Sequence, residues 1–419
     1  MKSLSSPLLR HSIISFIDQG VLSTTNFLVT VFLIREIPPE QFSVFVLTYA
    51  GILLAVGFQN ALVTTPMTVT GPKKTNDEKR AFVSSLAVTQ YVIWLPLCLA
   101  AAATAIFFGG GKMVASVIPT AGLAAIFVFL REFMRRAFFL YNSPVSVLIV
   151  DVIYSVLFLG AVLLFSQNSA SPARDAVLAM AGASALGGLF GVVIFHKTIN
   201  WRFSLKLDAL TAAWRHGRWN IMGVTVTWLS TQGFFFLLEF LRDGVAVTNV
   251  KASQQLLMPI VILLTSLTSV IKPRGAAWLS QGKKKTLFRV LGLITLGMIV
   301  LAAVYVTLLS WQAELLSTFI YKRDIAQLSL LLLLWGGVMA ASILRTNLAT
   351  LLQIFEKFNV LFYIGAAAAL ATLGGGYAAI SLFGAPGSLV GLFFGELTFL
   401  IGMSAVIWQR GWHNDRKRA

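Results

Sequence analysis

Long apolar stretches follow one another from one end of the chain to the other. A membrane-spanning helix needs about 20 largely apolar residues, and twelve stretches of this kind can be recognised. Spanning β-strands would instead show alternating segments of about ten residues. The pattern therefore predicts an all-α polytopic membrane protein with about twelve transmembrane helices. We expect them over residues 12–34, 42–70, 81–108, 113–130, 145–166, 176–196, 219–241, 250–271, 288–310, 325–344, 358–381 and 386–409.

Basic residues are concentrated in every second gap between these stretches. With the loops assigned alternately from an inner N-terminus, 26 of the 33 Lys and Arg fall inside and seven fall outside. This asymmetry follows the positive-inside rule and predicts that both termini are cytoplasmic. Lys2 and Arg10 precede the first apolar run as in a signal peptide, but the run is too long and no small-residue cleavage site follows it. We expect a retained first helix and a multi-pass protein of the bacterial inner membrane.

Composition supports this class and argues against others. The chain is 57% hydrophobic with a mean hydropathy of +0.81, and only 12% of its residues are charged, against about 25% in a soluble domain. Its net charge of +17 could suit nucleic acid, but the loop asymmetry indicates anionic membrane lipids as the partner instead. Cys98 is the only cysteine, the four His show no ligand spacing, and no Walker-type phosphate loop is present. We therefore predict that the protein is not an enzyme and that it has no cofactor, metal site or nucleic-acid partner.

The two halves of the chain repeat each other. Arg35 ends the first apolar stretch, and Arg242 ends the seventh, 207 positions later. Pro66 and Pro273, which we expect to end the second and eighth helices, are separated by the same 207 positions. A parallel duplication of six-helix units is a known transporter plan, with the substrate path between the halves. We predict two pseudo-symmetric six-helix lobes, over residues 1–196 and 219–409. A cytoplasmic linker, residues 197–218, joins them, and a basic cytoplasmic tail follows over residues 410–419.

The linker has an amphipathic pattern. Leu207, Leu210 and Trp214 fall on one helical face, and Asp208 is suited to capping the helix start. This favours a short helix lying on the inner membrane surface, and an ordinary loop is the alternative.

Polar side chains are concentrated in the first, second, seventh and eighth predicted helices. Polar groups in lipid are costly and should face a cavity or a partner helix. These four helices are corresponding pairs of the two halves, so we predict that they line a central path. The alternative for any one side chain is a hydrogen bond that joins neighbouring helices. The predicted substrate-binding residues are Asn26, Gln59, Asn60, Trp228, Gln232, Arg242, Lys251 and Gln255.

Charged residues within the apolar stretches are the second group of candidates. Asp18 attracts a cation when ionised and carries a proton when neutral, which makes it the candidate ion-coupling residue; a structural hydrogen bond is the alternative. Asp151 is expected to form a structural ion pair with one of the basic residues at 131–136. Arg242 can pair with Glu239 across one turn, and Lys251 either snorkels to the surface or faces the path. Glu396 is isolated, and the sequence does not assign it a role.

The chain resembles the polysaccharide and O-antigen flippases of the multidrug/oligosaccharidyl-lipid/polysaccharide (MOP) exporter superfamily. The likeness is carried by residues 42–66, by residues 131–139 followed by Asp151, and by residues 250–255 followed by Pro259 and Pro273. It implies two lobes that rock about a central cavity and a glycan substrate carried on undecaprenyl pyrophosphate. It also implies partners such as a polysaccharide polymerase or other assembly proteins. By position, Lys251 matches a basic residue common at the start of helix 8 in that family.

The leading hypothesis is thus a flippase for lipid-linked oligosaccharides or polysaccharide repeat units, working by alternating access in surface or exopolysaccharide biosynthesis. The first two predicted helices lack the deep Arg of the related peptidoglycan-precursor flippases, which argues against that substrate. The alternative is a cation-coupled multidrug exporter of the same superfamily. A membrane scaffold has no need of polar stripes, and a glycosyltransferase would show catalytic carboxylates in a large loop.

Overall fold

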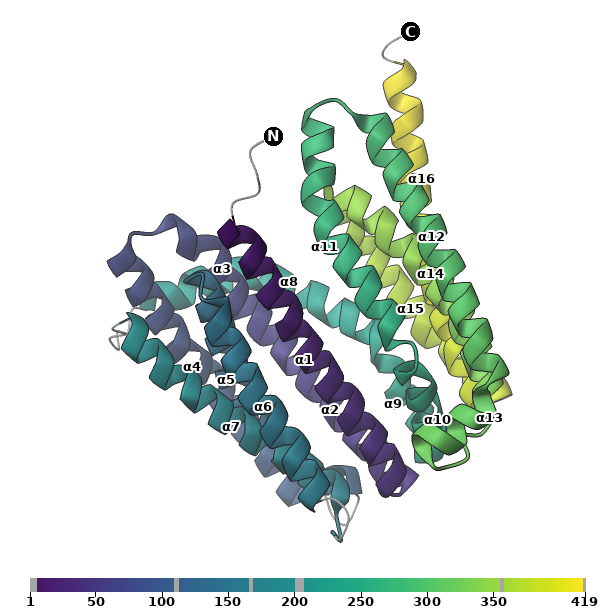
Figure 1. Cartoon of the computed structure of the whole chain (residues 1–419), viewed down its shortest axis with the longest axis horizontal. Coiled ribbons are helices and arrows are strands. Elements are labelled where there is room, and N and C mark those ends of the chain that lie inside the picture. Colours follow the sequence, from purple (N-terminus) through teal and green to yellow (C-terminus); the bar gives the residue numbers. More distant parts are fainter. Residues whose placement is uncertain (1–5, 109–112, 166–168, 200–206, 355–357, 417–419) are drawn as a thin grey trace. The chain divides into compact units, whose positions relative to one another are not determined.

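The computed structural model describes residues 6–108, 113–165, 169–199, 207–354 and 358–416 (Figure 1). The chain divides into two compact units, Met1–Thr225 and Val226–Ala419. The elements of the first unit are α1 (Ser6–Glu36), α2 (Pro39–Gln59), α3 (Thr65–Thr70), α4 (Asn76–Phe108), α5 (Met113–Leu140), α6 (Pro144–Phe165) and α7 (Pro172–Ile199). The division falls within α8 (Leu207–Thr231), and the second unit continues with α9 (Gly233–Leu241), α10 (Gly244–Gln255), α11 (Met258–Ser280), α12 (Lys284–Trp311), α13 (Ala313–Leu316), α14 (Leu328–Ile354), α15 (Phe358–Phe383) and α16 (Ala385–Arg416).

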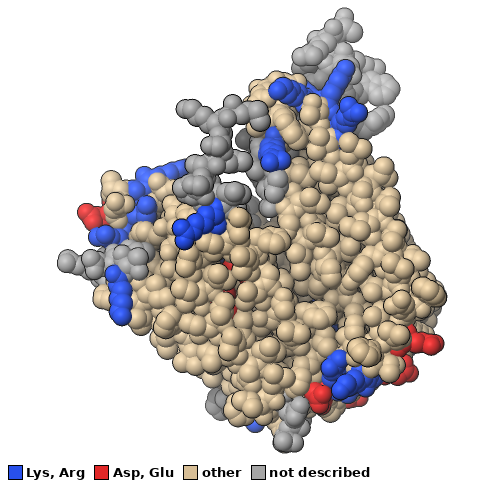
Figure 2. Space-filling view, viewed as in Figure 1, with Lys and Arg blue, Asp and Glu red and all other residues tan. Residues whose placement is uncertain are grey.

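Nine helices in the described part of the chain are long and apolar enough to cross a membrane, and eleven if each of two bent pairs forms one span. The bent pairs are α8 with α9 and α10 with α11. α5 occupies the position of the remaining predicted span, and it carries four charged residues between Arg131 and Arg136. The predicted fold class, an all-helical polytopic membrane protein, is confirmed. Figure 2 shows the broad uncharged surface that these helices present.

Local sequence signals explain where several helices begin. Prolines occupy the first turns of α2, α6, α7 and α11, where no intrahelical N–H is needed. Asp243 caps α10, because its Oδ1 accepts a hydrogen bond of 2.8 Å from the Ala246 N–H. The prediction that Pro66 and Pro273 end their helices was wrong. Pro66 lies in the first turn of α3, and Pro273 lies within α11, since neighbouring groups in a bundle can satisfy the backbone that a proline disturbs.

Helices α8 and α16 extend into the predicted linker and the predicted tail. α8 is continuous from Leu207 to Thr231, so the helix expected in the linker and the start of the seventh span form one element. Residues 200–206 and the side chains of Leu207 and Leu210 lie outside the described part, while Trp214 is exposed. At the other end, α16 runs on to Arg416, and residues 417–419 of the predicted tail lie outside the described part.

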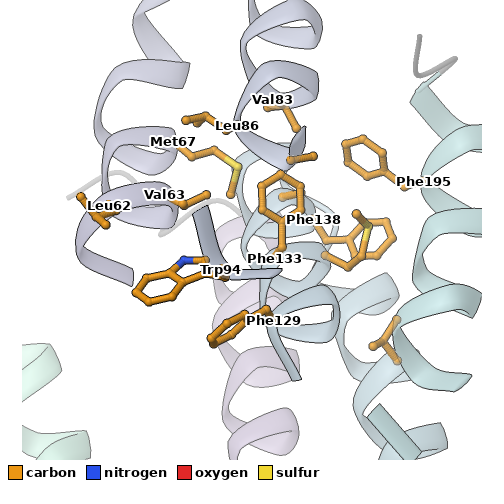
Figure 3. Packing of buried hydrophobic residues seen from close by; sticks show 14 of the residues in the cluster. Leu62, Val63, Met67, Val83, Leu86, Trp94, Phe129, Phe133, Phe138 and Phe195 are labelled. Atoms are coloured by element: carbon orange, nitrogen blue, oxygen red, sulfur yellow. The ribbon is translucent and has the colours of Figure 1, made fainter. Parts of the chain in front are cut away.

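An aromatic core holds the first unit together. Trp94 of α4 stacks on Phe58 of α2 and tilts against Phe129 of α5, with ring centroids 6.2 and 5.5 Å apart. Phe138 and Phe195 add an edge contact of 5.6 Å between α5 and α7. Figure 3 shows Trp94, Phe129, Phe138 and Phe195 among the buried side chains of the segment Asn60–Thr64, of α3 and of α4. Such packing fixes the helices that carry the charged cluster described below.

Glycines allow close contact between α15 and α16 in the second unit. Gly387, Gly391 and Gly395 recur every four residues on α16, and a Cβ at each would collide with α15. At Gly391 the obstacle is the backbone of Gly376. Small residues at this spacing let two membrane helices pack backbone to backbone.

Candidate functional site

Three irregularities in the helices coincide with predicted substrate residues. α2 ends at Gln59 and passes into a π-helical segment, Asn60–Thr64, before α3. α8 and α9 meet at Gln232 with a bend of 45°, and α10 and α11 meet after Gln255 with a bend of 53°. π-bulges are frequent at functional sites, and transporters place substrate and ion sites at broken helices.

Gln59 is buried and engaged within the first unit. Its Nε2 donates to Oε1 of Gln90 at 2.6 Å and to the carbonyl of Phe129 at 2.8 Å, which joins α2 to α4 and α5. Asn60 is half-buried, and its Oδ1 accepts a 2.7 Å hydrogen bond from the Thr64 hydroxyl. Asn26 is half-buried on α1. Gln59 thus has the helix-joining role that was the alternative for these polar groups.

A buried charged cluster surrounds Arg135 in the first unit. Its Nε donates to Oδ2 of Asp151 on α6 at 2.5 Å, and its Nη2 lies 3.3 Å from Oδ2 of Asp18 on α1. Its Nη1 donates to Oε2 of Glu132 at 3.0 Å. Asp18 and Asp151 are only 2% and 0% exposed. The predicted ion pair between Asp151 and the basic stretch of α5 is confirmed, and Asp18 joins the same cluster.

Arg131 is the second guanidinium of this cluster. Its Nη2 donates to Oε1 of Glu132 at 2.8 Å, and its guanidinium stacks 3.6 Å from the ring centroid of Tyr154. Three carboxylates therefore share two guanidinium groups, which leaves one excess negative charge when all five are ionised. Oδ1 of Asp18 and Oδ1 of Asp151 accept no hydrogen bond among the described residues. These two oxygens could accept one more proton or small cation, although Nε and Nη1 of Arg131 also lack a partner among the described residues.

Lys251 lies at the second break of the second unit. Its Nζ donates to Oε1 of Gln254 at 2.8 Å and lies 5.5 Å from the ring centroid of Phe235 on α9. That distance falls within the range of a cation–π contact. Gln255 is buried, and its Nε2 has no partner among the described residues. Lys251 also forms no ion pair with a described carboxylate, so a cation and an amide N–H remain available for an acceptor-rich ligand.

The first break of the second unit is lined by aromatic rings. Trp228 is half-buried, with its ring 5.4 Å from that of Phe236. Gln232 is half-buried at the bend itself, and its backbone N–H donates to the Trp228 carbonyl at 2.7 Å. The Phe235 contact links this segment to Lys251. The structure therefore places Trp228 and Gln232 at the first break and Lys251 and Gln255 at the second, and Phe235 is the contact between the two segments.

Hydroxyl groups hold the break between α10 and α11. Tyr321 Oη donates to the Ala252 carbonyl at 2.8 Å, and Tyr305 Oη donates to the Leu256 carbonyl at 2.9 Å. Trp335 Nε1 donates to the Ser253 hydroxyl at 3.1 Å. In a continuous helix these two carbonyls would accept from backbone N–H groups four residues later. Sequence reasoning missed all three side chains, because they come from distant segments of the chain.

Two further arginines have different roles from those expected. Arg242 donates from Nη2 to the carbonyls of Ile380 and Ser381 at 2.8 Å each, so it caps the C-terminal end of α15, where a cation is favoured. Arg345 directly follows the predicted span 325–344, but it lies within α14, and its Nε donates to Oε2 of Glu396 at 2.6 Å. This pair assigns Glu396 a partner. An Arg within an apolar stretch is the signal that could have found it.

Comparison with solved structures places this geometry in a known architecture. An inward-facing multidrug resistance MATE family transporter of the MOP superfamily matches with a TM-score of 0.75 at 12% identity, over 95% of this chain and 96% of that chain. The lipid II flippase MurJ, in an inward closed conformation, matches with 0.73 at 13% identity, over 95% and 87%. An outward-facing MATE family transporter matches with 0.66 at 14% identity, over 99% and 96%. No protein-family model matches the sequence, and no curated protein does either.

The chain has the fold of the MOP transporter superfamily. These MOP structures are of transporters, not enzymes, and they cover nearly the whole chain. At 12–14% identity the likeness establishes the fold. The MOP neighbours include both a multidrug transporter and a lipid II flippase, so the substrate has to be argued from the residues of this chain.

Proposed function

We propose that the protein is a flippase that moves a lipid-linked oligosaccharide or polysaccharide repeat unit across the bacterial inner membrane by alternating access. The MOP fold supports transport, because its solved members are transporters. The carrier we propose is undecaprenyl pyrophosphate, as the resemblance to polysaccharide flippases implies. The pathway is surface or exopolysaccharide biosynthesis.

The observation that carries this proposal is the unneutralised cation at the α10–α11 break. Lys251 lies within a bent pair that is apolar enough to span the membrane, yet none of the described carboxylates pairs with it. A charge inside a membrane marks a substrate or ion pathway and calls for a partner of opposite sign. A pyrophosphate group supplies that charge, and the Gln255 amide can donate a further hydrogen bond to it. A cationic drug would be repelled at this position.

The aromatic and amide groups of the α8–α9 break suit the glycan. Sugar rings present apolar faces that stack on aromatic side chains and hydroxyls that pair with amides. Trp228 supplies the ring and Gln232 the amide at the bend. The prenyl chain would remain in the lipid that surrounds the spans.

Asp18 is the proposed coupling residue. It contributes to a cluster with one excess negative charge, and its Oδ1 accepts no hydrogen bond among the described residues. Arg135 is held more closely by Asp151 and Glu132 than by Asp18, at 2.5 and 3.0 Å against 3.3 Å. Protonation or cation binding at Asp18 can therefore neutralise the cluster while Arg135 stays in place. We expect transport to depend on a proton or cation gradient.

The test is flipping of a fluorescent lipid-linked oligosaccharide in proteoliposomes, scored by its accessibility on each leaflet. Lys251→Ala should reduce the initial rate at least tenfold, and Lys251→Arg should retain most of it, because the positive charge is kept. Lys322→Ala is the matched control, since Lys322 is an exposed lysine that follows η3 (Ser317–Tyr321). Equal rates for Lys251→Ala and the control would refute the anion contact.

A cation-coupled multidrug exporter is the second candidate. The excess negative charge of the Arg135 cluster favours it, because carboxylates in a lobe can hold Na⁺ or a proton and attract cationic compounds. Export of a cationic dye without translocation of any lipid-linked glycan would move the assignment to this class.

A further inference from the structure

The turn between α11 and α12 carries a dense group of exposed cations. The two helices are joined by Gln281, Gly282 and Lys283, with Gly282 at a φ of +73°. All the Lys and Arg side chains around this turn are exposed. No Asp or Glu occurs between Asp243 and Glu314 in the sequence. We call this surface the hairpin tip; its residues are Lys272, Arg274, Lys283, Lys284, Lys285 and Arg289.

The helix start increases the positive potential there. The N-terminal end of an α-helix carries a partial positive charge, so carboxylates are favoured in the first turn and cations are not. α12 begins with Lys284 and Lys285 and has no acidic residue in its first turn. Neighbouring side chains therefore leave this potential uncompensated, and an external anion would stabilise the helix end.

The apolar surface of α12 places the hairpin tip at the edge of the bilayer. Leu293 and Leu296 are each 61% exposed, and α12 is the least buried of the candidate spans, with 22% of its apolar window buried. Arg289 precedes Leu293 by one turn, which corresponds to about 6 Å along the helix. A lipid-facing strip that starts one turn from the cations puts those cations at the depth of the headgroups.

The opposite end of the second unit differs. There the exposed charges include both signs: Arg242, Asp243, Glu314, Lys322 and Asp324. Figure 2 shows Lys and Arg alone over the end where α11 and α12 meet, and mixed charges at the other end. The surplus of cations is therefore a property of the hairpin tip and not of both ends of the unit.

We propose that the hairpin tip is a binding surface for the anionic headgroups of phospholipids in one leaflet. Clusters of four to eight Lys or Arg next to a membrane helix bind anionic lipid, and each adds roughly fivefold to the affinity. The adjacent lipid-facing strip of α12 favours a headgroup over an acidic protein, because the acyl chains would continue along Leu293 and Leu296. The binding secures α11 at the end remote from its break with α10.

The experiment compares the full-length protein in nanodiscs of phosphatidylcholine with and without phosphatidylglycerol. Wild type should unfold at a higher temperature as the anionic fraction rises, and native mass spectrometry should show retained phosphatidylglycerol. The variant K283Q/K284Q/K285Q should lose most of that shift and about 100-fold in lipid affinity. The matched control is K322Q/R323Q at the mixed end, which should behave as wild type.

Three outcomes would overturn the proposal. The triple variant could retain the lipid dependence of wild type, or the control could lose it equally. Inorganic phosphate added to phosphatidylcholine nanodiscs could also reproduce the whole shift, which would show a site for a free anion. None of these measurements requires transport, so the proposal is tested separately from the flippase assignment.

Discussion

Replacing Tyr321 by Phe tests whether the break between α10 and α11 is held by side-chain hydroxyls. The substitution removes one oxygen and keeps the ring, which is fully buried. Ala252 would lose the hydroxyl that its carbonyl accepts from at 2.8 Å. The backbone N–H of Leu256, which would serve a continuous helix, instead donates to the Gln254 carbonyl. The variant therefore leaves a backbone acceptor in a place that water does not reach.

The expected loss can be bounded from both sides. A buried group left without a hydrogen bond costs about 1–3 kcal/mol, while hydrogen bonds between membrane helices average about 0.6 kcal/mol and reach about 1.7. We expect a loss near 1.5 kcal/mol for Tyr321→Phe, close to the upper end of the membrane range. Tyr305 is only half-buried and donates to the Leu256 carbonyl at 2.9 Å. Tyr305→Phe should cost less, about 0.5 kcal/mol, because its surroundings can relax.

The assay is unfolding of the purified full-length protein in nanodiscs, followed by tryptophan fluorescence, with Tyr363→Phe as control. Tyr363 is 72% exposed on α15, so its variant should match wild type. Flipping by Tyr321→Phe should show a raised KM and a nearly unchanged kcat, because Lys251 and Gln255 flank the distorted turn. The reasoning fails if Tyr305→Phe is the more destabilised variant, or if Tyr321→Phe and Tyr363→Phe unfold alike.

Other substitutions test the remaining contacts. Arg135→Gln should cost about 3–5 kcal/mol in thermal unfolding, because three buried carboxylates would be left with one guanidinium. Asp18→Asn should remain folded but lose the dependence of flipping on an ion gradient; unchanged gradient dependence across pH would remove its coupling role. Gly391→Ala should cost about 1–3 kcal/mol by overpacking, whereas Gly292→Ala, where no atom lies within 4 Å, should cost nothing measurable in the same unfolding assay. Glu396→Gln should lower the unfolding temperature, because Arg345 would lose its counter-charge. Adding Arg345→Met should recover part of the loss.

Hydrophobic length was sufficient to predict the all-helical polytopic fold. This signal is local along the chain, and helix formation in lipid is obligatory because every backbone group must be satisfied internally. The boundaries were less predictable. Pro66 was expected to end a helix, but it begins α3 after a π-helical segment, which no residue pattern specifies. The predicted span 325–344 stopped one residue before Arg345, because the carboxylate that neutralises Arg345, that of Glu396, lies 51 positions away in the sequence.

The breaks in the helices coincide with stretches that the sequence marks as polar, but the contacts of individual side chains could not be predicted. Polar residues in the second, seventh and eighth stretches marked the elements that prove to be broken. The roles of individual side chains depended on distant partners: Gln59 on Gln90, and Arg242 on the end of α15. The sequence did not indicate that Tyr321 and Tyr305 hold the α10–α11 break, because tyrosines near helix ends are common at membrane interfaces for other reasons.

The two units carry unneutralised charges of opposite sign, and this difference is the strongest reason to propose that each unit binds a different ligand. The Arg135 cluster has one negative charge in excess, and Lys251 has no described carboxylate to balance it. Each charge is costly within the membrane unless a ligand of opposite charge binds to it. A proton or cation suits the first and an anionic headgroup suits the second. If one conformational equilibrium links them, each ligand must change the affinity of the other by the same factor. Binding of the lipid-linked pyrophosphate should then shift the cation affinity of wild type and leave that of Lys251→Ala unchanged.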